Sequence, residues 1–235
     1  MIMSTIEQNL QAVRGSIAQA VKEAQRAPQD VHLLAVSKTF GADAVLQAVQ
    51  AGQTAFGENY LQEALDKIAA VKTSLPQAQL VWHFIGPIQS NKTRPIAEHF
   101  DWVHTLEREK IAVRLSEQRP DGLPDLNICL QVNISGEASK SGVTPAELPA
   151  LARAVAQLPK LRLRGLMAIP EPETDLTRQR AAFAQLRVLY EQLQAEGIAL
   201  DTLSMGMSAD MSAAVLEGAT IVRVGSAIFG SRNYS

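Results

Sequence analysis

Residues 31–41 read VHLLAVSKTFG, an apolar run that gives way to Ser37 and Lys38. A continuous apolar run of this length predicts a strand buried on both faces, as the strands of parallel sheets are. Successive side chains of a strand point to opposite faces, so Leu34, Val36 and Lys38 share one face. Lysines are almost never fully buried unless they are paired. Lys38 therefore either reaches solvent where the strand ends or belongs to a site at that end.

Seven further strands are predicted, and they alternate with segments whose apolar residues recur at helical spacing. A helix is also predicted near the start of the chain, where residues 4–7, STIE, match a capping box. Thr144 and Pro145 predict the beginning of another helix. The predicted strands cover residues 31–37, 54–57, 80–86, 101–106, 126–133, 161–169, 202–207 and 220–230, the last running into a final turn. The predicted helices that follow them cover residues 42–52, 59–76, 90–100, 108–119, 144–159, 176–197 and 208–218.

This alternation predicts an α/β protein with a parallel sheet and crossover helices. Such a sheet is either open and doubly wound or closed into a (β/α)8 barrel. Eight units in 235 residues match the usual length of the barrel. No linker, low-complexity tract or block of charge divides the chain. We therefore expect a single-domain (β/α)8 TIM barrel over residues 1–235, preceded by an N-terminal helix.

The composition excludes several classes of protein. The chain has 22 lysine and arginine residues against 24 aspartate and glutamate residues, a net charge of −2, which provides no basic surface for nucleic acid or an anionic membrane. No apolar run approaches the roughly 18 residues of a membrane-spanning helix, and no secretory signal is visible. Cys129 is the single cysteine and is expected to be a small buried residue. These features predict a cytoplasmic protein.

Polar residues follow most of the predicted strands, and a barrel brings such strand ends together at its functional face. They include Ser37 and Lys38, residues 57–60, His83 with residues 86–92, Gln131 and Asn133, residues 205–208, and Arg223 with residues 225–226. Barrels often bind phosphate in the loops after strands seven and eight. Residues 205–208 and 225–226, which follow strands seven and eight, are therefore the first candidates for a phosphate site.

Two glycine-containing loops follow the last two strands. Gly206, Met207 and Ser208 supply backbone N–H groups, a hydroxyl and the start of a helical segment, and Gly225 and Ser226 supply the same set. Glycine turns and helix N-termini hold phosphate through their N–H groups and the helix dipole. The alternative is that these glycines only form tight turns. Two such loops side by side favour the phosphate site.

Lys38 and Arg223 extend this predicted site. A lysine amine shielded from water has a lowered pKa and becomes a nucleophile that forms an imine with an aldehyde. Arg223 shares a strand face with Gly225, and a guanidinium that faces a barrel interior needs a partner. A pyridine nitrogen is a candidate partner, as in pyridoxal phosphate enzymes. The alternative is an arginine that points outward between helices.

The sequence resembles the pyridoxal phosphate homeostasis proteins, a family of single-barrel proteins that bind pyridoxal 5'-phosphate (proline synthase co-transcribed homologues). The resemblance covers nearly the whole chain and rests on AVSKT, FGENYLQEA, WHFIGPIQSNK, GEASKSGV, GLMAI, SMGMSAD and RVGSAIFG, in that order. It implies a barrel like the N-terminal domain of alanine racemase. It also implies a role in intracellular cofactor homeostasis, by buffering or delivery.

The resemblance also assigns residues to the cofactor. It implies that Lys38 holds pyridoxal phosphate as an internal aldimine. It implies phosphate contacts from Ser208, the Met207 backbone, Gly225 and Ser226.

Arg223 would then lie beside the pyridine nitrogen, with Asn59 and His83 near the ring. His83 has an alternative as a core histidine. Lys92 and Lys140 also belong to family motifs. They are either solvated loop lysines or residues that act in cofactor release or transfer.

Two enzymes are alternatives to this carrier. A racemase of the alanine racemase type needs a base on each face of the cofactor, and its second base comes from a separate β-domain. Only residues 230–235 remain after about residue 229, where we expect the last strand and its final turn to end. A cationic Arg223 also disfavours protonation of the pyridine nitrogen. A cofactor-free Schiff-base aldolase would use Lys38 and the phosphate site, but needs acid–base carboxylates, of which the strand ends offer mainly Glu58. We expect a monomer without metal that holds the cofactor and contacts apo pyridoxal phosphate enzymes transiently.

Overall fold

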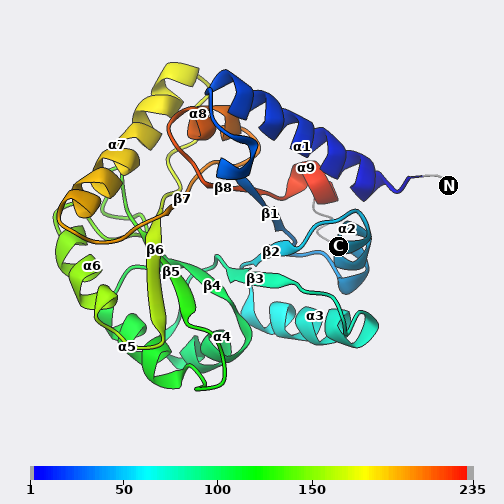
Figure 1. Cartoon of the computed structure of the whole chain (residues 1–235), viewed down its shortest axis with the longest axis horizontal. Coiled ribbons are helices and arrows are strands. Elements are labelled where there is room, and N and C mark those ends of the chain that lie inside the picture. The colour runs from blue at the N-terminus through cyan, green and yellow to red at the C-terminus, as the bar shows by residue number, and fades with distance from the viewer. Residues whose placement is uncertain (1–2, 232–235) are drawn as a thin grey trace.

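The computed structural model describes residues 3–231 of the chain. Its strands pair in parallel and in chain order, and β8 (Ile221–Val224) pairs with β1 (His32–Val36) to close the barrel. Parallel neighbours require a crossover connection, and helices supply it on the outside of the barrel. Figure 1 shows the strands at the centre with helices around them. The predicted (β/α)8 barrel with a preceding helix is confirmed.

Every predicted strand and helix overlaps an observed one. The largest difference is in the predicted strand over residues 220–230, of which β8 covers Ile221–Val224 and α9 covers Ser226–Phe229. The other strands are β2 (Ala55–Glu58), β3 (Val81–Phe84), β4 (Trp102–Leu106), β5 (Leu126–Gln131), β6 (Leu161–Met167) and β7 (Thr202–Ser204). The helices are α1 (Thr5–Glu23), α2 (Ala42–Gln50), α3 (Leu61–Ser74), α4 (Thr93–His99), α5 (Glu109–Gln118), α6 (Leu148–Ala156), α7 (Leu176–Ala195), α8 (Met211–Leu216) and α9 (Ser226–Phe229). Two short 3-10 helices are η1 (Pro28–Asp30) and η2 (Ser90–Lys92).

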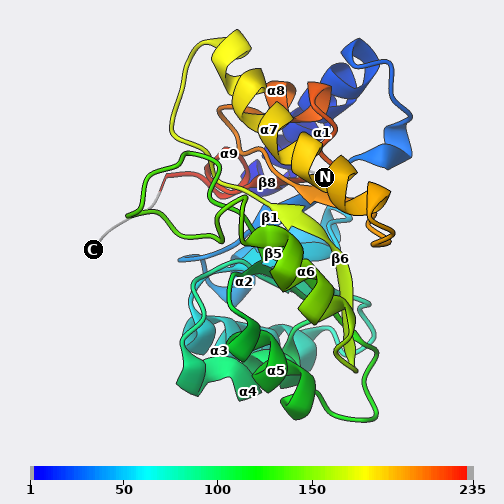
Figure 2. The same cartoon turned by 90° about the vertical axis from the view of Figure 1, so that its left-hand side faces the viewer.

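The N-terminal helix α1 packs beside α8 and α9, as both ribbon views show (Figures 1 and 2). Ser4 caps it, because its Oγ accepts the Glu7 N–H at 3.1 Å. Asn9 on this helix donates from Nδ2 to the carbonyl oxygen of Ile228 on α9 at 2.8 Å. The first and last helices of the described chain are therefore joined directly.

Helix α6 begins later than predicted. We expected a helix from Thr144 with Pro145 in its first position, but the helix begins at Leu148. Pro149 has no N–H group, so it cannot donate to the carbonyl oxygen of Pro145 and continue a helical ladder through that turn. Thr144 and Glu147 instead close a separate turn, in which Thr144 Oγ1 donates to Glu147 Oε2 at 2.8 Å and accepts the Glu147 N–H at 3.3 Å.

The barrel has two cores of different character. The larger surrounds the barrel, where outward strand residues such as Ala35, Phe56 and Val222 pack against the helices. The interior holds a smaller apolar cluster of Leu34, Val36, Ile85 and Ile221. Much of the remaining interior is polar, as described below. Cys129 is fully buried, as predicted.

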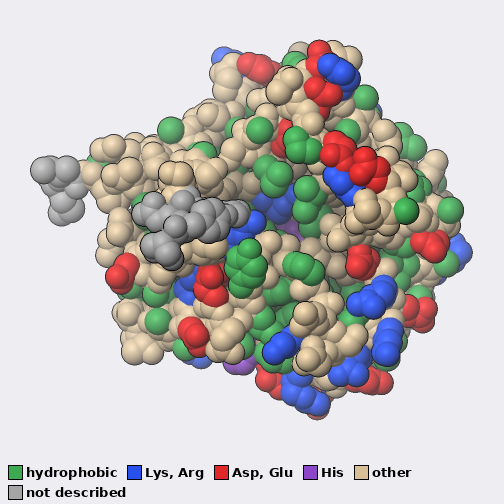
Figure 3. Space-filling model, turned by 180° about the vertical axis from the view of Figure 1, so that it is seen from behind, with side chains coloured by type: hydrophobic (Ala, Val, Ile, Leu, Met, Phe, Trp, Pro, Cys, Tyr) green, Lys and Arg blue, Asp and Glu red, His purple; other side chains and the backbone are tan. Residues whose placement is uncertain are grey.

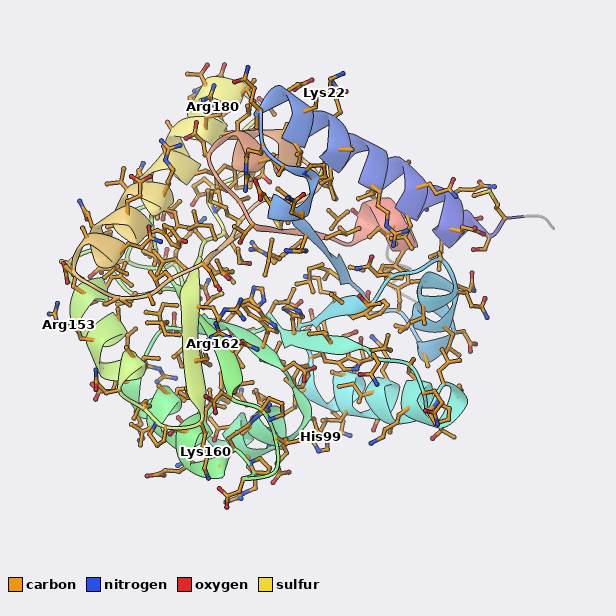
Figure 4. The ribbon with its side chains drawn as sticks, in the orientation of Figure 1. Lys22, His99, Arg153, Lys160, Arg162 and Arg180 are labelled. Atoms are coloured by element: carbon orange, nitrogen blue, oxygen red, sulfur yellow. The ribbon has the colours of Figure 1, made fainter. Side chains whose placement is uncertain are left out.

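The carboxyl ends of all eight strands open on the face away from the viewer of Figure 1. The long loops after β5 and β6 project from that face in Figure 2. Figure 3 looks onto it and shows a hollow near its centre with lysine or arginine side chains at its edge. Lys22, Arg153 and Arg180, in contrast, point outward from the surrounding helices (Figure 4). None of the helices within residues 3–231 is long and apolar enough to cross a membrane.

Candidate functional site

Lys38 lies at the open end of the barrel, two residues beyond β1. Leu34 and Val36 belong to the apolar cluster of the barrel interior, so the period of two directs Lys38 to the same side. The Lys38 side chain is half-buried. This position agrees with the site interpretation better than with a solvated surface lysine.

Arg223 occupies the interior, and the outward alternative does not apply. Its side chain is 4% exposed. Nη1 donates to Ser204 Oγ at 2.7 Å and Nη2 donates to the carbonyl oxygen of Ala168 at 3.1 Å. A guanidinium has five N–H groups, so three have no acceptor among the described residues. Burial lowers the pKa of Arg223 to about 10, partly offset by the Asp210 carboxylate, so the group remains a cation at neutral pH.

A line of hydrogen bonds continues from Arg223 across the interior. His104 Nδ1 lies 2.7 Å from Ser204 Oγ, and His104 Nε2 lies 2.8 Å from His83 Nδ1. Burial lowers the pKa of His83 to about 3 and that of His104 well below its ordinary value, so both rings are neutral. Ser204 Oγ accepts from Arg223 and still has one hydrogen and a second lone pair for His104. Where Ser204 donates to His104 Nδ1, the neutral His104 ring donates from Nε2 to His83 Nδ1.

His83 lies deeper in the barrel than the predicted ring contact suggests. Its ring stacks on Trp102, with centroids 5.2 Å apart. Both side chains line a cavity of about 540 Å³ at the amino-terminal end of the barrel. This placement fits the core-histidine alternative, with an indirect link to Arg223. A direct contact between His83 and the cofactor stays a prediction.

The loops after β7 and β8 are both closely packed, and the first of them requires glycine. Gly206 has a φ of +98°, and a Cβ there would lie 2.6 Å from the Cβ of Ala214. A Cβ on Gly225 would lie 3.1 Å from the carbonyl oxygen of Val36, the residue that ends β1. The second loop is therefore held against the strand that carries Lys38.

These loops present hydrogen-bond donors unequally. Ser208 and Ser226 are exposed, and their N–H groups have no acceptor within residues 3–231. The Met207 N–H, in contrast, already donates to Asp210 Oδ1 at 2.6 Å. The predicted contact between the Met207 backbone and a phosphate therefore requires Asp210 to turn away. All of these phosphate contacts stay predictions.

Asn59 offers a buried acceptor beside this face. It directly follows β2, and its Oδ1 is buried with no hydrogen-bond partner among the described residues. A Cβ on Gly86 would lie 2.1 Å from the Asn59 carbonyl oxygen, so only glycine allows these strand ends to approach. An unpaired buried polar atom is costly and calls for an explanation, such as a ligand. Asn59 therefore fits a ligand that donates a hydrogen bond.

The two loop lysines differ in their surroundings. Lys92 ends η2 and is exposed, which fits a solvated lysine. Lys140 is half-buried in the loop after β5 and forms an ion pair with Glu171 in the loop after β6. A role of either residue in cofactor release or transfer stays a prediction.

The sequence reasoning missed Lys67, His104 and Ser204. Lys67 is buried on α3 and donates to Glu58 Oε1 at 2.7 Å. The period of two in β4 places His104 on the face of Trp102, which is a signal that sequence alone contains. Nothing local marks Ser204 or Lys67, because their partners come from other parts of the chain.

The residues present fit a phosphate ester that also carries an aldehyde and a pyridine ring. Lys38 provides an amine, Arg223 a cation with unused donors, and Asn59 an unpaired acceptor. Two loops provide N–H groups for an anion.

Comparison with known proteins identifies the family. A family model described as alanine racemase, N-terminal domain, matches residues 8–233. The pyridoxal phosphate homeostasis protein of Pseudomonas aeruginosa is 63% identical over 232 residues, which are 99% of this chain and 98% of that protein. The protein of the same name from Escherichia coli is 54% identical over 233 residues, 99% of each chain. The chain belongs to the pyridoxal phosphate homeostasis protein family.

The predicted resemblance is thus confirmed, and solved structures agree with it. PipY of Synechococcus elongatus, solved with pyridoxal phosphate bound, is 39% identical to this chain with a TM-score of 0.82. The match covers 96% of this chain and all of PipY. A protein that shares this fold and 39% of this sequence therefore holds the cofactor.

Proposed function

We propose that this protein binds pyridoxal 5'-phosphate reversibly through Lys38 and acts in cofactor homeostasis, by buffering or delivering the cofactor. The observation that carries the proposal is that the buried Arg223 of β8 pairs in register with Leu34 of β1, the strand that ends two residues before Lys38. The relation to PipY, solved with pyridoxal phosphate bound, supports it.

Lys38 supplies the reversible attachment. Its neutral amine adds to the aldehyde carbon, a carbon–nitrogen double bond forms, and the aldehyde oxygen leaves as water with both amine protons. Water reverses the same step and frees the cofactor. When bound, the cofactor supplies the aldehyde and an electron-accepting ring.

Arg223 favours holding over turnover. It is a cation at neutral pH and is fixed by Ser204 and Ala168. A fixed cation beside the pyridine nitrogen disfavours protonation of that nitrogen, and an unprotonated ring is a poorer electron sink. This argues against the alternative of an amino-acid racemase.

The remaining contacts would orient the cofactor. Ser208, Gly225 and Ser226 supply donors for the phosphate, and Asn59 Oδ1 accepts a hydrogen bond from the ring side. We further propose a single-domain, cytoplasmic monomer whose partners are the cofactor and, transiently, apo enzymes that use it.

Absorption spectroscopy tests the attachment. The purified protein, mixed with pyridoxal phosphate, should develop a visible band near about 420 nm, the expected signature of the lysine–cofactor bond. The band should be absent in Lys38→Ala. A parent protein that stays colourless after incubation would contradict the proposal, and would favour the cofactor-free aldolase.

A transfer assay separates carrier from enzyme. Loaded protein is mixed with an apo pyridoxal phosphate enzyme, with and without amino acids, and the recovered enzyme activity is followed beside a chiral assay. Transfer without racemised product supports the carrier. Rapid racemisation would favour the racemase instead.

A further inference from the structure

The two residues that flank Lys38 are held by one group of charged side chains, Glu58, Glu63 and Lys67, which we call the clamp. Glu58 is the last residue of β2, and Glu63 and Lys67 lie four residues apart on α3. Glu58 is 0% exposed and Lys67 is 4% exposed. The clamp is therefore a largely buried set of charges directly beside the end of β1.

Lys67 ties Ser37 to both carboxylates. Its Nζ donates to the Ser37 carbonyl oxygen at 2.8 Å, to Glu58 Oε1 at 2.7 Å and to Glu63 Oε1 at 3.1 Å. The Ser37 hydroxyl donates to the same Glu58 oxygen at 2.5 Å. An ammonium group has three donors, so Lys67 uses all of them, and Ser37 is held by its backbone and its side chain.

Thr39 is held from the other side of Lys38. Its N–H donates to Glu63 Oε1 at 2.7 Å. Its φ is +67°, in the left-handed region that β-branched residues rarely adopt. Backbone strain of this kind costs on the order of 1–3 kcal/mol and persists only where the surroundings fix it. The backbone after Lys38 is therefore held in place.

The clamp lies on the outer side of the strand end. Ser37 faces Lys67 of α3, whereas Leu34 and Val36 of β1 face the barrel interior. A buried ion pair generally stabilises a fold no better than well-packed apolar residues of similar size. Here Glu58 Oε2 also has no hydrogen-bond partner among the described residues. Stability alone therefore does not account for the pair at this place.

We propose that Glu58, Glu63 and Lys67 are positioning residues that hold the backbone around Lys38 so that its amine meets the aldehyde of the cofactor. This inference rests on the proposed function, because it concerns the same lysine. Misplacing a reacting group by about 1 Å can slow a reaction by about 100-fold. With the backbone fixed, only side-chain rotations of Lys38 are needed to bring its amine to the aldehyde.

Glu63→Ala is the first test, because Glu63 is 35% exposed and the variant should fold. It removes the acceptor of the Thr39 N–H. We expect the visible band to grow at least about tenfold more slowly after pyridoxal phosphate is added. We also expect faster hydrogen exchange of the Thr39 amide in cofactor-free protein. Glu63→Gln keeps an acceptor oxygen and should restore most of both properties.

Glu58→Gln combined with Lys67→Met is the second test. It removes both buried charges at once, so that no unpaired charge remains inside. We expect cooperative unfolding to persist, while the band forms more slowly and the midpoint of its pH dependence moves. Glu217→Gln is the matched control. Glu217 is a buried carboxylate directly after α8, and it pairs with Arg180 of α7. It should change stability without changing the rate or the midpoint.

The outcomes separate this inference from the proposed function. If Glu63→Ala forms the band at the parent's rate and leaves Thr39 exchange unchanged, the clamp has no positioning role. That result rules out a positioning role for the clamp even if the double variant does not fold. A parent protein that never forms the band overturns the proposed function instead. Thr39 exchange, measured without cofactor, would still show whether the clamp holds the backbone.

Discussion

The hydroxyl of Ser204 joins Arg223 to His104 inside the barrel, with a distance of 2.7 Å on each side. One oxygen thereby accepts from a buried cation and also hydrogen-bonds a buried neutral ring. The three side chains come from β8, β7 and β4, so the link crosses the interior between strands that are not all neighbours. Ser204 pairs in register with Ile221, two residues before Arg223 on β8. Its hydroxyl therefore holds the guanidinium from the amino-terminal side of Arg223.

Ser204→Ala should destabilise the protein because two buried groups lose a partner at once. We expect the free energy of unfolding to fall by about 1–3 kcal/mol, measured by urea denaturation. Ser16→Ala is the control, since that hydroxyl is exposed and only bonds the carbonyl oxygen of Ala12. Equal stability of the two variants would show that the Ser204 link contributes nothing.

The buried histidines should make the fold acid-sensitive. The pKa of His83 is about 3 in the folded protein, against an ordinary 6.5, and the pKa of His104 is lowered as well. The unfolded chain therefore binds more protons below about pH 6.5. Stability is present above that pH and is lost as the pH falls toward 3, with a slope that approaches about 1.4 kcal/mol per pH unit for each histidine.

Denaturant midpoints between pH 7 and pH 4 measure this slope. His83→Gln should flatten it, while His32→Gln, at an exposed position, should not. Burial raises the pKa of Glu58 and acts in the opposite direction, so each variant is compared with the parent protein. A slope unaffected by His83→Gln would contradict this explanation.

Gly206→Ala should damage the loop after β7 in two ways. Its φ of +98° is strained for alanine, and the new Cβ would meet Ala214. Gly197→Ala separates the two effects, because Gly197 has a φ of +90° with nothing within 4 Å of a Cβ. We expect Gly197→Ala to cost about 1–2 kcal/mol of stability and Gly206→Ala to cost more. Only Gly206→Ala should also weaken binding of inorganic phosphate or pyridoxal phosphate.

Asn59→Ala should separate binding from stability. Because Asn59 Oδ1 has no partner among the described residues, its removal should leave the thermal midpoint of cofactor-free protein unchanged or slightly higher. Cofactor affinity should fall about fivefold, the equivalent of one hydrogen bond of about 1 kcal/mol. Calorimetric titration with pyridoxal phosphate measures it. Unchanged affinity would remove Asn59 from the site.

Local periodicity predicted the strands and helices, and eight such units in 235 residues predicted the closed barrel. The inward direction of Lys38 stays a prediction from alternation in β1. Alternation also predicted that Arg223 faces inward, and Arg223 is buried inside the barrel. The start of α6 did not, because Pro149 blocks the ladder one turn beyond the predicted cap.

The partners of these residues could not be predicted from the sequence. His104 meets Ser204 across 100 positions of sequence, and Lys67 meets Ser37 across 30. Such contacts depend on the register and stagger of the closed sheet, which no single segment encodes. Met207 is a different case, because its N–H, which we expected to contact a phosphate, donates to Asp210 only three residues away.

The join between α1 and α9 bears on how the protein forms during synthesis. Asn9 and Ile228 are 219 positions apart, and β1 lacks one of its two neighbours until β8 has been made. A growing chain emerges N-terminal end first, so Lys38 leaves the ribosome long before Arg223 does. Half-made chains thus expose the lysine without the arginine that would complete its site. Cofactor capture should accordingly be a property of finished chains, which spares the cell from losing cofactor to unfinished ones.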